Sequence, residues 1–287
     1  MIRISIAFIV LTSLGSIKAQ NLEYAFIIYN AKGKKISVEK MMKASDDADC
    51  IFFGEYHDNP ISHWLEFELA SHLSKNKSLC FGFEMFESDQ QEILDAYLNN
   101  KLDNKQFKDS CRLWPNYETD YKPIIDLAKD KGIPCIASNV KRKYASLLFK
   151  KGRHALDTLP EIEKNRFANL NFVVDSTLSQ YREVRKMGGH GMGNNMMEAQ
   201  AFKDATMAMH IKKYLELNVK VLHFNGAFHS DYFQGILWYL KQEKSLSSKK
   251  YLTITTVSQE SILNIDKDHL GKADYIICVP ETMTKTH

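Results

Sequence analysis

The sequence feature that most constrains the fold is a short apolar run that stops at Gly54 and is followed at once by polar side chains. Those side chains belong to Glu55, Tyr56, His57 and Asp58. The next two residues, Asn59 and Pro60, are typical of a helix start, because proline in the first helical turn loses no hydrogen bond. The stretch therefore predicts a buried strand, a tight polar loop and a helix. Such a loop lies at the carboxyl end of its strand, and in open α/β sheets ligands bind at the edge formed by these strand ends.

The same alternation of apolar strand-like runs and helices recurs along the chain. Further strands are expected at residues 79–85, 133–138, 219–224 and 252–257. A β-hairpin is expected near residues 25–37, and residues 274–279 are expected to form a last, edge strand. Strands that alternate with helices favour parallel pairing. We therefore predict an α/β fold with a mainly parallel central sheet flanked by helices.

The strand pattern breaks between residues 140 and 217, where the sequence predicts helices and loops. We interpret this segment as a helical cap inserted in a single α/β domain of residues 20–287. The stretch at 187–197 is too rich in glycine to favour a helix, so a loop is expected before a long alanine-rich helix. His190 in that loop lies near several methionines, which fits either a lid over a ligand or an unstructured crossing between helices.

Residues 1–19 have the pattern of a secretory signal peptide, with a basic start, an apolar run and a small residue, Ala19, at the end. The apolar run is too short to span a membrane, and no other run predicts a transmembrane segment. Cleavage after Ala19 would remove Arg3 and Lys18 and change the formal charge from +3 to +1 (3 − 2). A nearly neutral protein does not indicate a nucleic-acid partner. The predicted location is the periplasm or the outside of the cell.

The chain has five cysteines, and export would allow them to form disulfides. An odd, widely spaced set without a Cys-x-x-Cys motif does not predict a disulfide framework. Most of the cysteines lie in apolar strand-like runs, where a free cysteine behaves as a small hydrophobic residue. Buried, inert thiols are therefore expected.

The motif Gly-x-x-His occurs twice, ending at His57 and at His229, each time after a predicted strand. Glu84 lies at the end of another strand. If these strand ends converge, both imidazoles face one crevice together with Glu55 and Glu84. His57, Glu84 and His229 can hold a divalent metal, and the same set with Glu55 can act as general acid and base. His63 lies one helical turn further on and can join them. Alternatively, these residues hydrogen-bond one another and brace the loops.

A basic segment opens the predicted cap. Lys141 lies three residues before Tyr144, so both side chains can share one helical face. A nearby cation favours the phenolate, and a phenolate can ligate ferric haem iron. The alternative is a basic surface around a half-buried tyrosine.

Together these segments resemble the ChaN-like haem-binding uptake family. The resemblance rests on F-G-E-Y-H-D-N-P at residues 53–60, F-E-M-F at 83–86, N-G-A-F-H at 225–229 and the helix that carries Gln200 and Met207. It covers about residues 50–257. The family is similar in turn to the TIKI/TraB and erythromycin-esterase-like proteins, which share the two Gly-x-x-His motifs with a glutamate between them. Many of those proteins are hydrolases.

The resemblance implies an exported protein that binds haem and takes part in haem or iron uptake, with a receptor or transporter as its partner. It also implies a homodimer that holds two haems face to face. A tyrosine of one chain would ligate iron, with Tyr144 as the expected ligand and Tyr181 as the alternative. A histidine and a lysine of the other chain would hold the propionates, and His190 with Lys186 or Lys141 would serve.

Two functions therefore stay open. The first is a binding protein that holds haem in an apolar cleft under the cap, with aromatic lining from Trp114, Tyr117 and Phe149. The second is a metal-dependent hydrolase of peptides or esters that uses Glu55, His57, Glu84 and His229. There the metal would acidify a bound water and a carboxylate would take its proton. Family members are often lipoproteins, but the first cysteine of this chain is Cys50, so no lipid anchor is expected.

Overall fold

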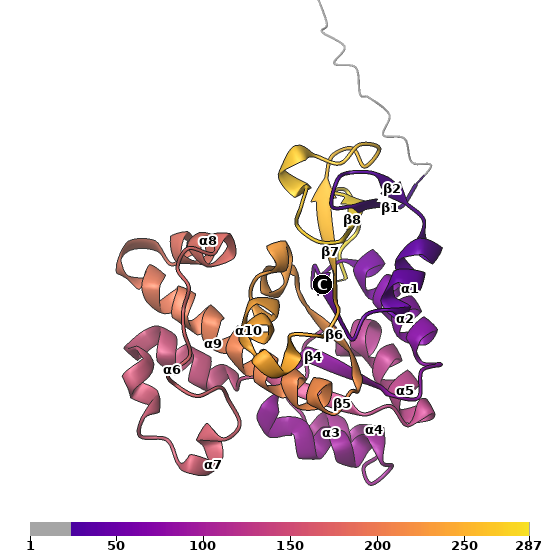
Figure 1. Cartoon of the computed structure of the whole chain (residues 1–287). Coiled ribbons are helices and arrows are strands. Elements are labelled where there is room, and N and C mark those ends of the chain that lie inside the picture. The colour runs from indigo at the N-terminus through magenta and orange to yellow at the C-terminus, as the bar shows by residue number, and fades with distance from the viewer. Residues whose placement is uncertain (1–23, 287) are drawn as a thin grey trace, which may run out of the picture.

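The computed structural model describes residues 24–286, so the predicted signal peptide at residues 1–19 lies outside the described residues. The described chain forms an eight-stranded sheet with helices on both faces (Figure 1). The strands are β1 (Ile27–Asn30), β2 (Lys35–Ile36), β3 (Cys50–Glu55), β4 (Leu79–Glu87), β5 (Cys135–Asn139), β6 (Lys220–Gly226), β7 (Tyr251–Gln259) and β8 (Tyr275–Pro280). The helices are α1 (Val38–Asp46), α2 (Pro60–Leu73), α3 (Gln91–Leu98), α4 (Asn104–Ser110), α5 (Lys122–Lys131), α6 (Arg142–Lys151), α7 (Glu161–Lys164), α8 (Ser179–Met187), α9 (Gly189–Glu216) and α10 (Ile236–Gln242).

The strand order in the sheet is β2-β1-β8-β7-β3-β6-β4-β5. Neighbouring strands from β8 to β5 are parallel, whereas β1 pairs antiparallel with both β2 and β8. The predicted α/β fold with a mainly parallel sheet is thus confirmed. The prediction of an edge strand at residues 274–279 is wrong, because β1 pairs with β8 and places Ile27 opposite Cys278. The N-terminal hairpin therefore covers that edge.

Both faces of the sheet are buried, and β3 shows how its sequence achieves this. Ile51 and Phe53 belong to the apolar core with α1, α2 and α5. Cys50 and Phe52 belong to the core on the opposite face, with α10 and the C-terminal half of α9. Successive side chains of a strand point to opposite faces, so a strand covered on both sides is apolar throughout. The five cysteines are free and buried, as predicted.

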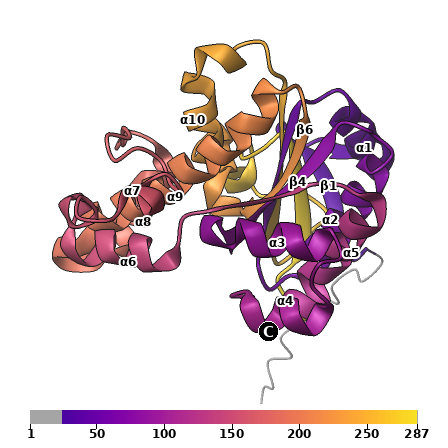
Figure 2. The same cartoon turned by 90° about the horizontal axis from the view of Figure 1, so that it is seen from below.

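Between β5 and β6, the helices α6, α7 and α8 and the N-terminal half of α9 form a lobe beside the sheet (Figures 1 and 2). This helical lobe has its own apolar cluster, which includes Tyr144, Leu148, Phe167 and Phe202. Helix α9 is 28 residues long and connects the lobe to one face of the sheet. Within the described chain, neither α9 nor any other helix combines the length and apolar character needed to cross a membrane.

The glycine-rich stretch at residues 187–197 does not form the predicted loop. Helix α8 ends at Met187 and α9 begins at Gly189, whose φ of 61° allows a sharp turn between the two helices. A Cβ on Gly188 would lie 2.6 Å from Cα of Gly193, and a Cβ on Gly193 would clash with the carbonyl oxygen of Arg185. The prediction was wrong because these glycines allow α8 and α9 to pack closely, which outweighs their low helix propensity.

Candidate functional site

The two Gly-x-x-His loops meet because β3 and β6 are neighbouring parallel strands. Glu55 at the end of β3 lies opposite Gly226 at the end of β6. A Cβ on Gly226 would lie 2.9 Å from Cε1 of His57, and a Cβ on Gly54 would lie 3.1 Å from Cα of Ala227. Each glycine thus leaves space for the other loop, which explains why both motifs begin with glycine.

Glu84 reaches the same place from β4, on the other side of β6. The register between β4 and β5 shifts between Phe83 and Glu87, and such irregularities often re-aim a side chain. Oε2 of Glu84 accepts the backbone N–H of Gly226 at 2.7 Å. Its Oε1 lies 3.1 Å from Nε2 of His229. The predicted convergence of the strand ends therefore occurs, and Glu84 bridges the two motifs.

His229 lies between two buried carboxylates. Its Nε2 faces Glu84 and its Nδ1 is hydrogen-bonded to Asp204 of α9. Burial by itself would lower the pKa of His229, but the two carboxylates outweigh it and raise the pKa to about 10. Burial would raise the pKa of Glu84, but the charge of His229 holds it well below its usual range. His229 is therefore a buried imidazolium.

Tyr181 supports this arrangement from α8. Its hydroxyl donates to Oδ2 of Asp204 at 2.8 Å, and the side chain is fully buried. Burial and the charge of Asp204 raise the pKa of Tyr181 well above its usual value. Asp204 was not among the residues predicted from the sequence. It lies four residues after Gln200, which contacts the same histidine, and this helical spacing is the signal that the sequence offers.

His57 is more accessible than His229, with 42% of its side chain exposed. Its Nδ1 lies 2.6 Å from Oε1 of Glu55, and its ring packs edge-on against Trp114 with 4.8 Å between centroids. Burial lowers the pKa of His57, but the hydrogen bond to Glu55 and the charge of Glu84 raise it above the usual value. Because Nδ1 is engaged, Nε2 is the nitrogen that His57 presents for chemistry.

The loop that carries His57 is held from several directions. The carbonyl oxygen of His57 accepts a hydrogen bond from Nε2 of His63 at 3.0 Å. The next carbonyl, of Asp58, accepts the backbone N–H of Thr286 at 2.9 Å. The carboxylate of Asp58 forms an ion pair of 2.6 Å with Lys285. The segment at residues 285–286 therefore packs on the loop.

A cavity of about 820 Å³ lies between the strand ends and the helices α6, α8 and α9. This volume is within the usual range of small-molecule sites, roughly 300–1,000 Å³. One side is polar and contains Glu55, His57, Glu84 and His229. The other side is apolar and contains Ala145, Phe149, Val184, Met187, Met196 and Ala199. Three cationic side chains also line the cavity, those of Arg142, Lys203 and Lys285.

Tyr144 does not line this cavity. It is buried in the helical lobe, and its hydroxyl donates to Oε2 of Glu163 at 2.8 Å. Burial and the hydrogen bond to Glu163 raise the pKa of Tyr144 to about 12. The expectation that Lys141 favours the phenolate is therefore wrong. Nζ of Lys141 lies 2.7 Å from Asp89 and 5.9 Å from the centre of the tyrosine ring.

The remaining predicted residues have mixed placements. Lys186 is exposed and pairs with Glu183 at 2.7 Å. His190 lies in the first turn of α9, but its side chain lies outside what the structure describes. Phe149 lines the cavity as expected. Tyr117 does not, because it is buried in the core against Phe107.

The predicted metal ligands His57, Glu84 and His229 line one cavity. Both ring nitrogens of His229 face carboxylates, however, so this imidazole must release a proton before it can bind a metal. Among residues 24–286, a different group brings three ligand atoms within 4.8 Å of one another, namely Glu55, His63 and Glu66. His63 and Glu66 lie on α2, behind the cavity.

The strand ends of this mainly parallel sheet carry two Gly-x-x-His loops and a bridging glutamate. The class is therefore an α/β protein with a ligand site at the carboxyl edge of its sheet. The family model for haem-binding uptake proteins of the Tiki superfamily, ChaN, matches residues 41–240. The chain therefore belongs to the ChaN haem-binding uptake family, and the resemblance found in the sequence is confirmed.

Solved structures agree on the fold. The chain is similar to ChaN of Campylobacter jejuni, whose structure shows cofacial haem binding, with a TM-score of 0.66 and 21% identity over 88% of this chain and 96% of that one. It is also similar to a mutant of the erythromycin esterase EreC in its open conformation, with a TM-score of 0.51 and 10% identity over 88% of this chain and 97% of that one.

Among curated proteins, the chain is 28% identical over 120 residues to RETICULATA-RELATED 5, a chloroplastic protein of Arabidopsis thaliana. That match spans 39% of this chain and 16% of the plant protein.

The buried charge of His229 predicts a specific dependence of stability on pH. Its pKa of about 10 exceeds the value of about 6.5 for an unfolded histidine, so its contribution is complete below about pH 6.5 and is lost as the pH rises toward 10. The free energy of unfolding should fall by on the order of a few kcal/mol across that window. The loss should be smaller in Asp204→Asn, which removes one of the two negative partners.

Urea titrations at several pH values would measure this effect, and NMR of the imidazole would follow the pKa of His229 directly. Asp46→Asn is the matched control, because it removes the carboxylate from an exposed pair with His72. A measured pKa of His229 near 6.5 in the wild-type protein would contradict the prediction.

Proposed function

We propose that this protein binds haem in the cavity between the strand ends and the helical lobe, as part of haem or iron uptake. The observation that carries the proposal is the two-sided cavity in a member of a haem-binding family. Its apolar side, which includes Phe149, Met187 and Met196, suits the face of a porphyrin. Its polar side presents an accessible imidazole, that of His57.

His57 fits the role of an iron ligand on the geometry of this chain. Glu55 holds Nδ1 at 2.6 Å, which fixes the ring and leaves Nε2 for the metal. A carboxylate on the outer nitrogen also raises the basicity of a ligating histidine. Tyr144, the ligand that the resemblance implies, stays a prediction. It would first have to give up its hydrogen bond to Glu163 and turn toward the cavity.

The cavity also carries cations for the propionates. Arg142, Lys203 and Lys285 line it, and Lys285 already pairs with Asp58. These three supplement Lys141, Lys186 and His190, whose propionate role stays a prediction. Charge complementarity of this kind sets the orientation of a bound ligand more than its affinity.

A homodimer is part of the same proposal. Met187 and Phe228 line the cavity, yet these residues are 61% and 41% exposed. A second copy of the chain, or the haem that it holds, would cover this apolar surface. An uptake receptor or transporter remains a predicted partner of the haem-loaded form.

Titration of the purified protein with ferric haem tests the proposal. The Soret band should shift and saturate at about one haem per chain. His57→Ala should weaken binding by at least roughly 10- to 100-fold, because it removes a direct iron bond. With His57 as the iron ligand, Tyr144→Phe should leave the spectrum unchanged, whereas Tyr144 as the ligand would make Tyr144→Phe the variant that loses it. Light scattering with and without haem would measure the molar mass and show whether the protein forms a dimer.

His72→Ala is the matched control, since His72 lies on α2 and pairs with Asp46 away from the cavity. In the opposite pattern, Tyr144→Phe abolishes binding and His57→Ala has no effect. That result would assign the iron ligand to Tyr144 in the helical lobe. A titration without any saturable shift would remove haem binding altogether.

One observation favours a second candidate, a hydrolase of esters or peptides. The pair Glu55–His57 has the arrangement of an oriented general base, in which Nε2 can take a proton from water. The cations Arg142, Lys203 and Lys285 line the same cavity and can stabilise negative charge that develops on a substrate. In the metal-dependent alternative that the sequence predicts, His229 would first release its proton, and a divalent metal held by His57, Glu84 and His229 would acidify a bound water.

The hydrolase candidate predicts turnover of esters or peptides by the wild-type protein, with or without added Zn²⁺ or Mn²⁺. Loss of a general base costs roughly 10²–10⁴-fold in rate, so kcat of His57→Ala should fall by that factor while His72→Ala keeps the wild-type rate. A broad substrate panel followed by chromatography would measure this. An inert wild-type protein would eliminate the hydrolase and leave the haem proposal intact.

Export is proposed on the pattern of residues 1–19. The mature protein should begin at Gln20 and occur in the periplasm or the medium without a lipid anchor. Mass spectrometry of the intact protein from those fractions would detect its N-terminus. Recovery of a chain that still starts at Met1, or of a lipid-modified terminus, would refute this.

A further inference from the structure

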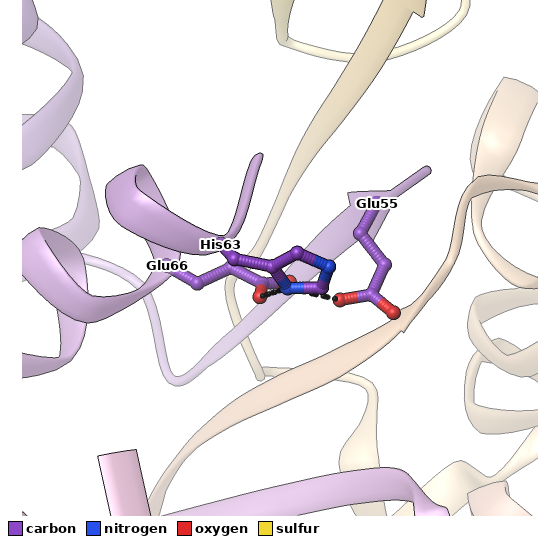
Figure 3. Close-up of side chains that lie close together, drawn as sticks. All are labelled: Glu55, His63 and Glu66. Atoms are coloured by element: carbon purple, nitrogen blue, oxygen red, sulfur yellow. Dashed lines mark hydrogen bonds and ion pairs between the residues drawn. The ribbon is translucent and has the colours of Figure 1, made fainter. Parts of the chain in front are cut away.

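Behind the cavity, three side chains form a buried cluster in which His63 and Glu66 have no part in either proposed function and Glu55 has a second contact besides His57. They are Glu55 from the end of β3 and His63 and Glu66 from α2 (Figure 3). Nδ1 of His63 lies 3.0 Å from Oε2 of Glu66 and 3.4 Å from Oε2 of Glu55. Figure 3 shows both carboxylates directed at this one nitrogen. Glu66 is fully buried, and Glu55 and His63 are nearly so.

The cluster has more acceptors than the described residues satisfy. Oε2 of Glu55 and Oε1 of Glu66 are buried and have no hydrogen-bond partner. Within residues 24–286, neither carboxylate forms an ion pair with a lysine or arginine. Buried polar atoms normally have partners, and a buried carboxylate is costly unless a cation compensates it. The two carboxylates also lie within hydrogen-bond reach of each other, so the open oxygens call for a cation between them, either a metal ion or a shared proton.

The histidine is already oriented for a metal ion. Its Nε2 lies 3.0 Å from the carbonyl oxygen of His57 and 3.4 Å from Oδ2 of Asp120, so Nε2 carries a proton. Burial lowers the pKa of His63, but Glu66 and Glu55 outweigh it and raise the pKa to about 10, so a metal must displace a second proton from Nδ1. Metal-binding histidines usually donate their outer N–H to such acceptors, which fixes the inner nitrogen as the ligand. Glu55 is held likewise, because the hydroxyl of Tyr121 donates to its other oxygen at 2.5 Å.

We propose that Glu55, His63 and Glu66 bind a divalent transition-metal ion, such as Zn²⁺ or Mn²⁺, through carboxylate oxygens and Nδ1 of the imidazole. One nitrogen and several carboxylate oxygens are the donor set that these ions accept. The three ligand atoms already lie within 4.8 Å of one another. This site is distinct from the predicted set of His57, Glu84 and His229.

The role of this ion would be structural. The cluster is closed to solvent, so the metal enters as the chain folds, and it ties the end of β3 to α2. Oε1 of Glu55 also holds Nδ1 of His57. The ion would thus fix the position of the imidazole that faces the cavity, whichever ligand the cavity binds.

Metal analysis of protein purified without chelator or histidine tag tests the site. About one equivalent of Zn²⁺ or Mn²⁺ should remain after dialysis. Removal of the metal under mildly denaturing conditions should lower Tm, and either ion at about 100 times its Kd should raise it again by roughly 5–10 °C. These readouts do not depend on haem binding or on hydrolysis.

Three variants separate the possibilities. Glu66→Gln keeps the shape of the side chain and should abolish the bound metal and the rise in Tm. His72→Gln, on the same helix, should retain both. Glu84→Gln should also retain both, because it alters only the cavity. Loss of metal in Glu84→Gln and retention in Glu66→Gln would overturn the proposal in favour of the cavity site.

A wild-type protein that takes up neither ion would also overturn the proposal. A proton would then occupy the cluster, since burial and the charge of Glu55 raise the pKa of Glu66 well above its usual value. Should Glu66→Gln fail to fold, X-ray absorption spectroscopy of the Zn²⁺-loaded wild-type protein would identify the ligands of the ion. A single imidazole among oxygen ligands supports the site, and two imidazoles contradict it.

Discussion

The parallel pairing of β3 with β6 is the constraint on which the site depends. It places Glu55 opposite Gly226, so the two Gly-x-x-His loops leave the sheet side by side. Only the absence of a side chain at Gly54 and Gly226 lets the loops approach this closely. The polar side of the cavity is therefore set by the backbone of two central strands rather than by mobile loops, which gives its groups a fixed geometry.

Charge is balanced inside this geometry through histidine rather than through lysine or arginine. Glu84 and Asp204 share the imidazolium of His229, and Glu55 faces two further imidazoles, those of His57 and His63. Buried charges are tolerated where each has a close partner of opposite sign. Around His229, every oxygen of the two carboxylates has a partner. Around His63, two carboxylate oxygens lack hydrogen-bond partners.

The sequence predicted what depends on local signals. The apolar runs that end at Gly54 and Gly226 located the strands, and therefore the edge where His57 and His229 converge. Partners from distant segments gave little local signal. Asp204 of α9 and Glu163 of α7, rather than neighbours in the sequence, determine what His229 and Tyr144 do. The loop predicted for the glycine-rich stretch was wrong for the same reason, since packing between α8 and α9 outweighs the low helix propensity of glycine.

Glu55 touches two environments with a single carboxylate. Oε1 faces His57 at the cavity, and Oε2 faces the buried cluster. The two oxygens share one charge, so electron density drawn toward one is withdrawn from the other. A change in charge in the buried cluster must therefore alter the proton affinity of His57. By linkage, a ligand that engages His57 must alter the affinity of the cluster by the same factor. The end of β3 is thus a thermodynamic coupling element between the interior and the cavity.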